Sequence, residues 1–457
     1  MRLHNLAPVA AILVAAASTN GCRPAPSQSV RDGDSVSVGL RPRLPTGVKL
    51  DPAAPLTDAG PMALSMRISP EGNRAVILLS GQSMQGIQVL DATTGVVTQT
   101  IPQAAGFIGL AFSPDGKTLY ASGGNQDVVY RYDWSGGRAS LRDSIVIAPK
   151  KPKENGTSYP AGLALSRDGR TMYVAENLAD SLAVVDVESG KIIQRFPTER
   201  YPYDVIADAE GKVYVSAWGG STISTFHTTG NGRLADDGRI AIARHPSAMT
   251  LSRDGSRLFV ASGSTDHVAV FDTKRKRIVA RLLDPAPKGP SEGATPNFLT
   301  LSDDGTRLYV AEADANAVGV FDLSQMSSNI ASANGSDRLS GRIPTGWYPT
   351  AVGIAANGLL VANGKGRGTA PSISGPERKN PLAAIEGAVM RIPLDRTTGA
   401  ELQQLTARVA NANGWNGDVS RSHRYPPFEH VIYIIKENRT YDQVLGDIKE
   451  GNGDPSL

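Results

Sequence analysis

The chain has 457 residues, a formal net charge of +3 and a single cysteine. Hydrophobic residues make up 40% of it and charged residues 20%, which is a globular composition rather than a disordered one. The near balance of charge argues against a nucleic-acid-binding protein, which normally carries a basic face. One cysteine excludes an intrachain disulfide framework and a cysteine-rich zinc site.

The first 21 residues are predicted to be a secretory signal peptide. Arg2 supplies the positive charge at the start, and residues 6–17 form an apolar segment. This segment of 12 residues is too short to cross a bilayer as a helix. We therefore expect an exported bacterial protein.

The cleavage site leaves two alternatives open. Ala15-x-Ala17 suits an ordinary signal peptidase, whereas Gly21-Cys22 resembles a bacterial lipobox, in which Cys22 becomes the lipidated N-terminus. Residues 22–45 are rich in proline, serine and arginine and are predicted to be a tether. The expected location is the periplasm, either free or attached to the cell envelope by the lipid. That lipid is the only membrane contact that we expect.

One short pattern recurs seven times between residues 46 and 411. A small polar turn with glycine precedes an alternating strand, as in SPDGKTLYASG and SRDGRTMYVAE. The turn glycines lie 42 to 53 residues apart, at Gly72, Gly116, Gly169, Gly211, Gly255, Gly305 and Gly358. Repeats of this length with several strands in each copy are typical of propeller blades.

Prolines fix the register within the repeat. Five of them lie nine residues before a turn glycine: Pro160, Pro202, Pro246, Pro296 and Pro349. Proline is tolerated as the first residue of a strand, so each is predicted to begin an inner strand. Four strands in each of seven copies predict an all-β fold, a seven-bladed β-propeller over residues 46–411. A strand near residues 37–49 is predicted to close the ring beside residues 387–393 and 401–410.

The strand ends MYVAEN, LYVAEA, LFVASG and LLVANG resemble the YVTN-type β-propeller repeat of bacterial surface and periplasmic proteins. The resemblance covers roughly residues 46–411. It implies the fold and says little about function, because propellers host binding, scaffolding and catalysis alike.

Two glutamates end YVAE strands, where the loops between blades are predicted to meet the channel mouth: Glu176 and Glu312. Such a carboxylate can bind a cation or a substrate, or it can accept hydrogen bonds from turn amides. The histidines form no H-x-H or H-E-x-x-H pattern. With no cofactor or carboxylate cluster visible, the sequence does not favour a lactonase or quinoprotein-like propeller enzyme.

Aromatic residues gather next to the register prolines, at Tyr159, Tyr201, Trp347 and Tyr348. They are predicted to surround one face of the channel, either as a platform for an envelope ligand or partner protein or as packing between blades. The glycine-rich, basic segment 364–386 is long for a loop, and loops of this length are often functional.

The last 30 residues do not follow the repeat. The apolar run 431–435 is typical of a strand buried on both faces, and the polar cluster 436–439 follows its carboxyl end. Ligands and metals bind at that end of the strands in open α/β sheets. We predict a connector at residues 412–427 and an incomplete α/β segment at 428–457.

This segment resembles the opening of a phosphoesterase of the alkaline-phosphatase superfamily, in the branch of bacterial phospholipases C and acid phosphatases. The matching phrase is HVIYIIKENRTYD, from His430 to Asp442. The resemblance implies that Glu437 and Asn438 help to hold a catalytic divalent metal ion and to bind the phosphate. A carboxylate and an amide oxygen suit a hard cation.

The resemblance also implies that the full-length form hydrolyses phosphate esters with a divalent metal ion, while the propeller binds a ligand or partner or acts as a scaffold. The nucleophile, the Asp-Asp pair and the metal-binding histidine of that family come from later sequence. We therefore expect the present chain to stop within the catalytic domain and to be inactive. The alternative is a non-enzymatic propeller that binds an envelope component.

Overall fold

The computed structural model describes residues 44, 47–149, 156–283, 293–324, 339–368 and 385–416, with a few isolated positions after residue 429. The predicted signal peptide, Cys22, most of the tether, and Glu437 and Asn438 lie outside the described residues. Residues 48–416 belong to one compact unit, and the fold is described within it.

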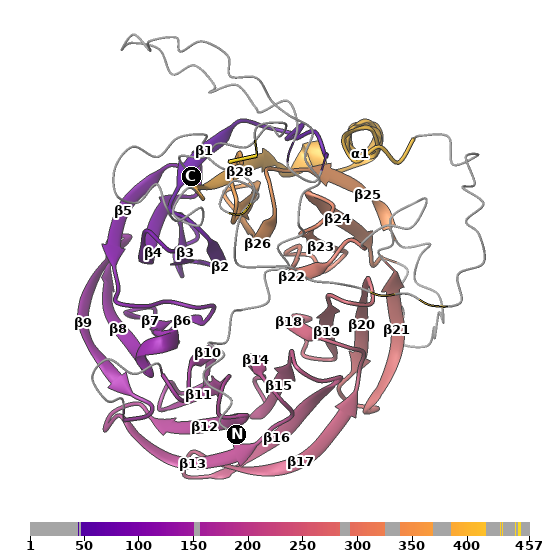
Figure 1. The fold of residues 1–457 in the computed structure, drawn as a ribbon. Helices are drawn as coiled ribbons and strands as arrows, with labels where there is room; N and C mark the ends of the chain where they lie inside the picture. The colour runs from indigo at the N-terminus through magenta and orange to yellow at the C-terminus, as the bar shows by residue number, and fades with distance from the viewer. Residues whose placement is uncertain are drawn as a thin grey trace. The chain divides into compact units, whose positions relative to one another are not determined.

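Seven antiparallel sheets of four strands stand in a ring, which forms a β-propeller (Figure 1). Blade 1 contains β2 (Ala63–Ile68), β3 (Arg74–Ser80), β4 (Gln85–Asp91) and β5 (Val97–Pro102). Blade 2 contains β6 (Leu110–Phe112), β7 (Thr118–Ser122), β8 (Val128–Ser135) and β9 (Arg138–Val146), with a 3-10 turn, η1 (Gly124–Gln126), between β7 and β8. Blade 3 contains β10 (Pro160–Leu165), β11 (Thr171–Glu176), β12 (Ser181–Asp186) and β13 (Lys191–Pro197).

The next three blades repeat this arrangement. Blade 4 contains β14 (Pro202–Ala207), β15 (Lys212–Ala217), β16 (Thr222–Gly230) and β17 (Arg233–Ala241). Blade 5 contains β18 (Pro246–Leu251), β19 (Arg257–Ser262), β20 (His267–Asp272) and β21 (Arg277–Leu283). Blade 6 contains β22 (Pro296–Leu301), β23 (Arg307–Glu312), β24 (Ala317–Asp322) and β25 (Leu339–Pro344). The five register prolines begin β10, β14, β18, β22 and β26, which confirms the predicted inner strands.

Blade 7 combines the two ends of the propeller. It contains β26 (Pro349–Ala355), β27 (Gly358–Asn363) and β28 (Gly387–Pro393), and its outer strand is β1 (Leu56–Ala59). Leu56 pairs with Met390 and Ala59 with Gly387. The strand that closes the ring was therefore predicted at the wrong place, since residues 56–59 do what was expected of residues 37–49. Closure by an early strand satisfies the edge of β28 that would otherwise be unpaired.

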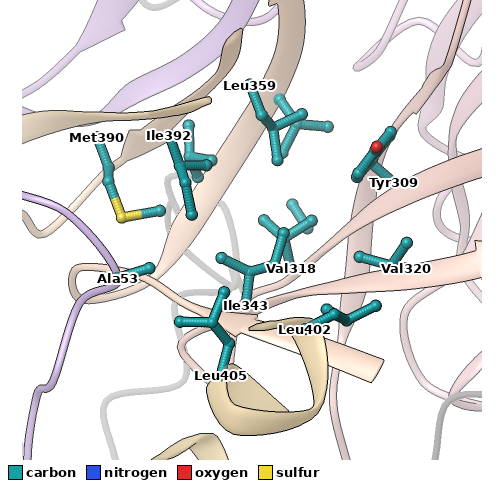
Figure 2. Close-up of a cluster of buried hydrophobic side chains, with 13 residues drawn as sticks. Ala53, Tyr309, Val318, Val320, Ile343, Leu359, Met390, Ile392, Leu402 and Leu405 are labelled. Carbon is teal, nitrogen blue, oxygen red and sulfur yellow. The ribbon is translucent and has the colours of Figure 1, made fainter. Parts of the chain in front are cut away.

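Residues 401–410 are not a strand but part of the helix α1 (Gly399–Ala412), which follows a 3-10 turn, η5 (Leu394–Thr397). The buried residues Leu402, Leu405 and Val409 are three and four positions apart, which is the helical period. Leu402 and Leu405 pack against Ile343 of β25 and its neighbours (Figure 2). The helix thus covers the outer edge of blade 6. No helix within the described ranges is long and apolar enough to span a membrane.

The core consists of apolar contacts between neighbouring blades. One cluster joins Val76 and Ile87 of blade 1 to Leu119 and Tyr132 of blade 2, and comparable clusters recur around the ring. Alternate side chains of a strand point to opposite faces of its sheet, so each blade packs against both of its neighbours.

The strand order places two kinds of connection at opposite ends of the blades. One end is here called the mouth face. It holds the hairpins 123–127, 177–180, 218–221, 263–266 and 313–316. It also holds the described residues that enter the inner strands, at 147–149, 156–159, 198–201, 242–245, 293–295 and 345–348. The other end, here called the far face, holds the turns with the repeated glycines, such as 166–170, 252–256 and 302–306.

Candidate functional site

A central cavity of about 260 Å³ lies between the inner strands of the ring. Strands β2, β14, β18, β22 and β26 contribute to its wall, which mixes apolar side chains with polar groups. Among the described residues that line it, Arg67 is the one cation and Asp204 the one carboxylate, and Thr250 and Thr300 add hydroxyl groups. The cavity therefore combines apolar side chains with a few polar groups, as small-molecule sites commonly do.

Arg67 projects from β2 into this cavity. Its guanidinium carbon lies 5.9 Å from the centre of the Phe298 ring, and its Nη1 donates to the carbonyl oxygen of Met66 at 3.1 Å. These two contacts hold the side chain against the wall of the channel. The flat guanidinium retains further N–H groups that can pair with a carboxylate or a phosphate.

Asp204 lies on β14 and is 9% exposed. Its Oδ1 accepts from the backbone N–H of Val205, and its Oδ2 accepts from that of Met249 on β18, each at 2.9 Å. Burial raises the pKa of Asp204, while the positive charge of Arg67 and these two amides oppose the rise. The carboxylate therefore links blades 4 and 5 and leaves part of its acceptor capacity toward the cavity.

Neither Arg67 nor Asp204 belongs to the site residues predicted from the sequence. In the repeat, the position of Asp204 is occupied by Gly162, Ala248 and Phe298 in other blades. The sequence signal for Asp204 was therefore a charged residue at a repeat position where other blades have small or apolar residues. The common location of Arg67 and Asp204 could not be inferred, because they lie on different blades and meet only when the ring is assembled.

Glu176 is 1% exposed and is held by side chains of its own blade and the segment before it. Its Oε1 accepts from Ser158 Oγ at 3.0 Å, and its Oε2 accepts from Ser181 Oγ at 2.7 Å and from Arg195 Nε at 3.0 Å. Its partners in these bonds are hydroxyl and guanidinium groups instead of turn amides. The role of Glu176 in binding a ligand stays a prediction.

Glu312 occupies the matching position in blade 6 and is fully buried. Its Oε2 accepts from Arg342 Nε of β25 at 2.6 Å. The guanidinium of Arg342 also lies 5.3 Å from the ring of Trp415. Both YVAE glutamates thus pair with an arginine of the fourth strand. Neither lines the central cavity.

The candidate tyrosines share an unusual backbone conformation. Tyr159, Tyr201 and Tyr348 have φ angles of 55°, 54° and 62°, in the left-handed region that few non-glycine residues adopt. Each backbone N–H donates to an acid or amide side chain in the preceding blade's hairpin, at 2.7 to 2.9 Å: Asp127, Asp180 and Asn316, respectively. These three side chains join consecutive blades at the mouth face.

The side chains of the four candidate aromatics divide into separate groups. Tyr159 packs edge-on against Phe107, with ring centres 5.2 Å apart. Trp347 and Tyr348 share Lys365, whose amine lies 5.1 Å and 4.3 Å from the two ring centres. Burial raises the pKa of Tyr348 to about 12 and lowers the pKa of Lys365.

Tyr201 forms a third group, because its ring faces the guanidinium of Arg200 at 5.5 Å. All four aromatics are half-buried, so they contribute both packing and exposed ring surface. Of the long segment 364–386, residues 369–384 lie outside the described residues.

In the part of the chain that the structure describes, no group of three or more histidine, cysteine, aspartate or glutamate side chains could hold a metal ion. The predicted metal ligands Glu437 and Asn438 are outside that part. The divalent metal ion therefore stays a prediction from the resemblance of residues 430–442.

Two family models match overlapping parts of the propeller. The SMP-30/Gluconolactonase/LRE-like region model matches residues 150–264, and the model of the seven-bladed β-propeller lactonases matches residues 235–345. Each covers less than half of the chain. A lactonase was not favoured by the sequence motifs, whereas these two matches show that parts of the propeller resemble lactonases. No curated protein sequence matches the chain.

Solved structures resemble the whole propeller. Hydrazine synthase of Kuenenia stuttgartiensis aligns with a TM-score of 0.56 at 18% identity, over 74% of this chain and 97% of that one. A putative 6-phosphogluconolactonase of Bacteroides fragilis gives 0.50 at 16%, over 63% and 86%. Virginiamycin B lyase of Staphylococcus aureus gives 0.50 at 14%, over 72% and 94%. At these identities the likeness shows the fold alone. The chain is a β-propeller protein with seven four-stranded blades.

Proposed function

We propose that the propeller is a small-molecule-binding module, and that its ligand is a small, hydroxylated organic anion held by Arg67 in the central cavity. The observation that carries this proposal is one guanidinium in a cavity of about 260 Å³ whose wall combines apolar and polar surface. Sites for drug-sized ligands measure about 300–1,000 Å³, so this cavity suits a smaller molecule.

The two charged groups give the ligand an orientation. The anionic group lies against Arg67, which can donate two parallel hydrogen bonds to a carboxylate or a phosphate. The carboxylate of Asp204 repels a second negative charge and accepts from a hydroxyl group instead. The matches to gluconolactonase and lactonase models support a small hydroxylated ligand of this kind.

We propose further that this module belongs to an exported, metal-dependent phosphoesterase, located in the periplasm or attached to the envelope through Cys22. The support is the phrase from His430 to Asp442, which carries Glu437 and Asn438 in the expected positions. The metal ion would polarise the phosphoryl group and activate the nucleophile. A non-enzymatic propeller that binds an envelope ligand is the alternative, and it keeps the same cavity.

Titration calorimetry with glycerol 3-phosphate and gluconate tests the cavity, and neutral glycerol serves as the control ligand. Replacing a charge-assisted hydrogen bond costs about 1.5–3 kcal/mol, so R67A is expected to weaken binding by about 10–100-fold. R67K keeps the charge and should retain part of the affinity. R142A is the matched control, because Arg142 lies on the outer strand β9, where it pairs with Asp133 of β8 and does not line the cavity. Unchanged affinity in R67A would refute the proposed ligand position.

A separate assay tests the phosphoesterase. We expect divalent-metal-dependent hydrolysis of bis(p-nitrophenyl) phosphate in a protein that carries residues 1–457 together with the nucleophile, the Asp-Asp pair and the metal-binding histidine of the family. In that protein E437Q should lower turnover while anion binding by the propeller is retained. Binding without turnover there would favour the non-enzymatic alternative.

A further inference from the structure

Three residues from blades 4 and 5 come together on the mouth face, apart from the central cavity. Trp218 follows β15, His245 precedes β18, and Ser264 lies in the hairpin after β19. The imidazole of His245 stacks on the indole of Trp218, with ring centres 4.8 Å apart and planes 15° from parallel. Its Nδ1 is within hydrogen-bond distance of Ser264 Oγ.

The backbone fixes His245 between the two hairpins. Its φ angle is 58°, and Pro246 follows it as the first residue of β18. Its N–H donates to the carbonyl oxygen of Gly220 at 3.0 Å, and its own carbonyl accepts from the N–H of Gly263 at 3.3 Å. Trp218 is fixed in turn, since its N–H donates to the carbonyl oxygen of Tyr201 at 2.8 Å. The backbones of both residues are thus fixed, and stacking on Trp218 holds the imidazole near Ser264.

The chemistry of this pair suits proton transfer. Burial, with a smaller effect of Arg244, lowers the pKa of His245, so the imidazole is neutral at neutral pH. A neutral ring with its proton on Nε2 presents Nδ1 as an acceptor to the hydroxyl group of Ser264. Ser264 itself is exposed, whereas His245 is half-buried. A serine hydroxyl next to an oriented base is the arrangement that activates a nucleophile, and here stacking on Trp218 orients the base.

His267 in the same blade offers a useful contrast. It is 8% exposed, and its Nδ1 contacts the carbonyl oxygen of Thr265 at 3.1 Å. That histidine is enclosed within the blade, whereas His245 faces a hydroxyl group that solvent can reach. The two histidines thus have different surroundings, and His245, unlike His267, is placed to serve a reaction.

We infer that Ser264 and His245 form a nucleophile–base pair that hydrolyses small carboxylic esters at the mouth face. Ser264 Oγ bonds to the carbonyl carbon while its proton passes to His245 Nδ1. The ester C–O bond then breaks, and the leaving alkoxide takes that proton. Water, deprotonated by the same nitrogen, attacks the acyl-serine, and the free acid leaves as the serine hydroxyl is restored. The inference does not depend on the ligand of the central cavity.

A fluorophosphonate probe, which reacts with activated serines, tests the nucleophile directly. The full chain is incubated with the probe, and the labelled residue is identified by peptide mass spectrometry. We expect one adduct on Ser264, absent from S264A. General-base assistance contributes about 10²–10⁴-fold, so H245N, which keeps a polar atom near Nδ1 but no base, should react at least about 100-fold more slowly.

The matched control is S221A, since Ser221 is an exposed serine in the adjoining hairpin whose N–H binds Glu199. It should react like the unchanged chain, and p-nitrophenyl acetate hydrolysis should follow the same order. If H245N does not fold, the comparison of probe labelling between the unchanged chain and S264A still shows whether Ser264 is the nucleophile. No adduct on Ser264, an adduct on another serine instead, or equal labelling of a folded H245N would each overturn the inference.

Discussion

The two faces of the propeller stabilise their connections in different ways. On the far face, a turn is self-contained: Asp168 Oδ1 accepts from Ser166 Oγ at 2.6 Å, two residues away. On the mouth face, Asp127 accepts from the backbone N–H groups of residues 157–159, about thirty residues later and at the entrance to the next blade. The far-face turn at Asp168 therefore closes on its own residues, although the far-face turn of blade 1 also has a partner in the next blade, since Glu71 accepts from Trp134 Nε1 at 3.1 Å. The mouth-face connection at Asp127 forms only when blades 2 and 3 are both in place.

The difference explains why the candidate sites lie where they do. The central cavity combines residues from separate blades, and Trp218 of blade 4 stacks on His245 at the entrance to blade 5, beside Ser264. A local turn can only present its own few side chains, but a junction between blades can combine groups that are distant in sequence. Binding and catalytic residues are accordingly expected at the inner strands and the mouth face.

The largest effect on stability is expected from the buried ion pair at the mouth end of blade 6. Removing one partner of a buried pair costs about 3–5 kcal/mol, because the other charge stays buried. The side chains of Glu312 and Arg342 are 0% and 4% exposed, so E312A should lower the free energy of unfolding by about this amount. Urea denaturation measures it.

The matching pair in blade 3 is the control. The side chain of Arg195 is 47% exposed and can turn to solvent when its partner is removed. E176A should therefore cost clearly less than E312A, although both glutamates end the same YVAE phrase. Equal losses would mean that burial of the arginine does not decide the effect.

An intermediate effect is expected from the connection between blades 2 and 3. D127A leaves the N–H groups of residues 157–159 without their acceptor, and an unsatisfied buried donor costs about 1–3 kcal/mol. We expect a loss of about 3 kcal/mol for D127A and about 1 kcal/mol or less for D168A on the far face. Hydrogen exchange should show faster opening of residues 156–165 in D127A alone. If D168A cost as much as D127A, the contrast between the faces would not hold.

The contrast between local turns and connections between blades also explains which features of the fold and the site could be predicted from the sequence. The far-face turns were predictable because each Ser-x-Asp-Gly turn contains both partners of its hydrogen bonds. The inner strands followed from prolines at a constant offset, and the number of blades followed from the repeat. Asp127, Asp180 and Asn316 are visible in the sequence, yet nothing local shows that their partners lie in the next blade.

Two errors have a similar physical cause. The closing strand could not be assigned to residues 56–59, because pairing with β28 is a contact between the two ends of the propeller. The helix α1 was read as strand, although Leu402, Leu405 and Val409 follow the helical period and were the available signal. Arg67 and Asp204 were missed because β2 and β14 approach each other only around the closed ring.

The smallest effect on stability is expected from protonation of two aspartates in the far-face turns, Asp254 and Asp304. Hydrogen bonds from the hydroxyl groups of Ser252 and Ser256, together with the Ser256 amide, lower the pKa of Asp254 to about 2. A serine hydroxyl, a threonine amide and a threonine hydroxyl likewise lower the pKa of Asp304 to about 2. The ordinary value is 3.8, so the folded state favours both ionised carboxylates. Their contribution to stability is complete above pH 3.8 and is lost as the pH falls through about 2.

The double variant D254N/D304N isolates this contribution, because asparagine keeps the size of the side chain but does not ionise. Above pH 4 the variant should unfold at a slightly lower temperature than the unchanged chain. The difference should shrink as the pH falls from about 4 and be small near pH 2, where each carboxylate is about half protonated in the folded state. Thermal unfolding between pH 2 and pH 6 measures it. A difference that stays constant over this range would show that these turns do not depend on the ionised carboxylate.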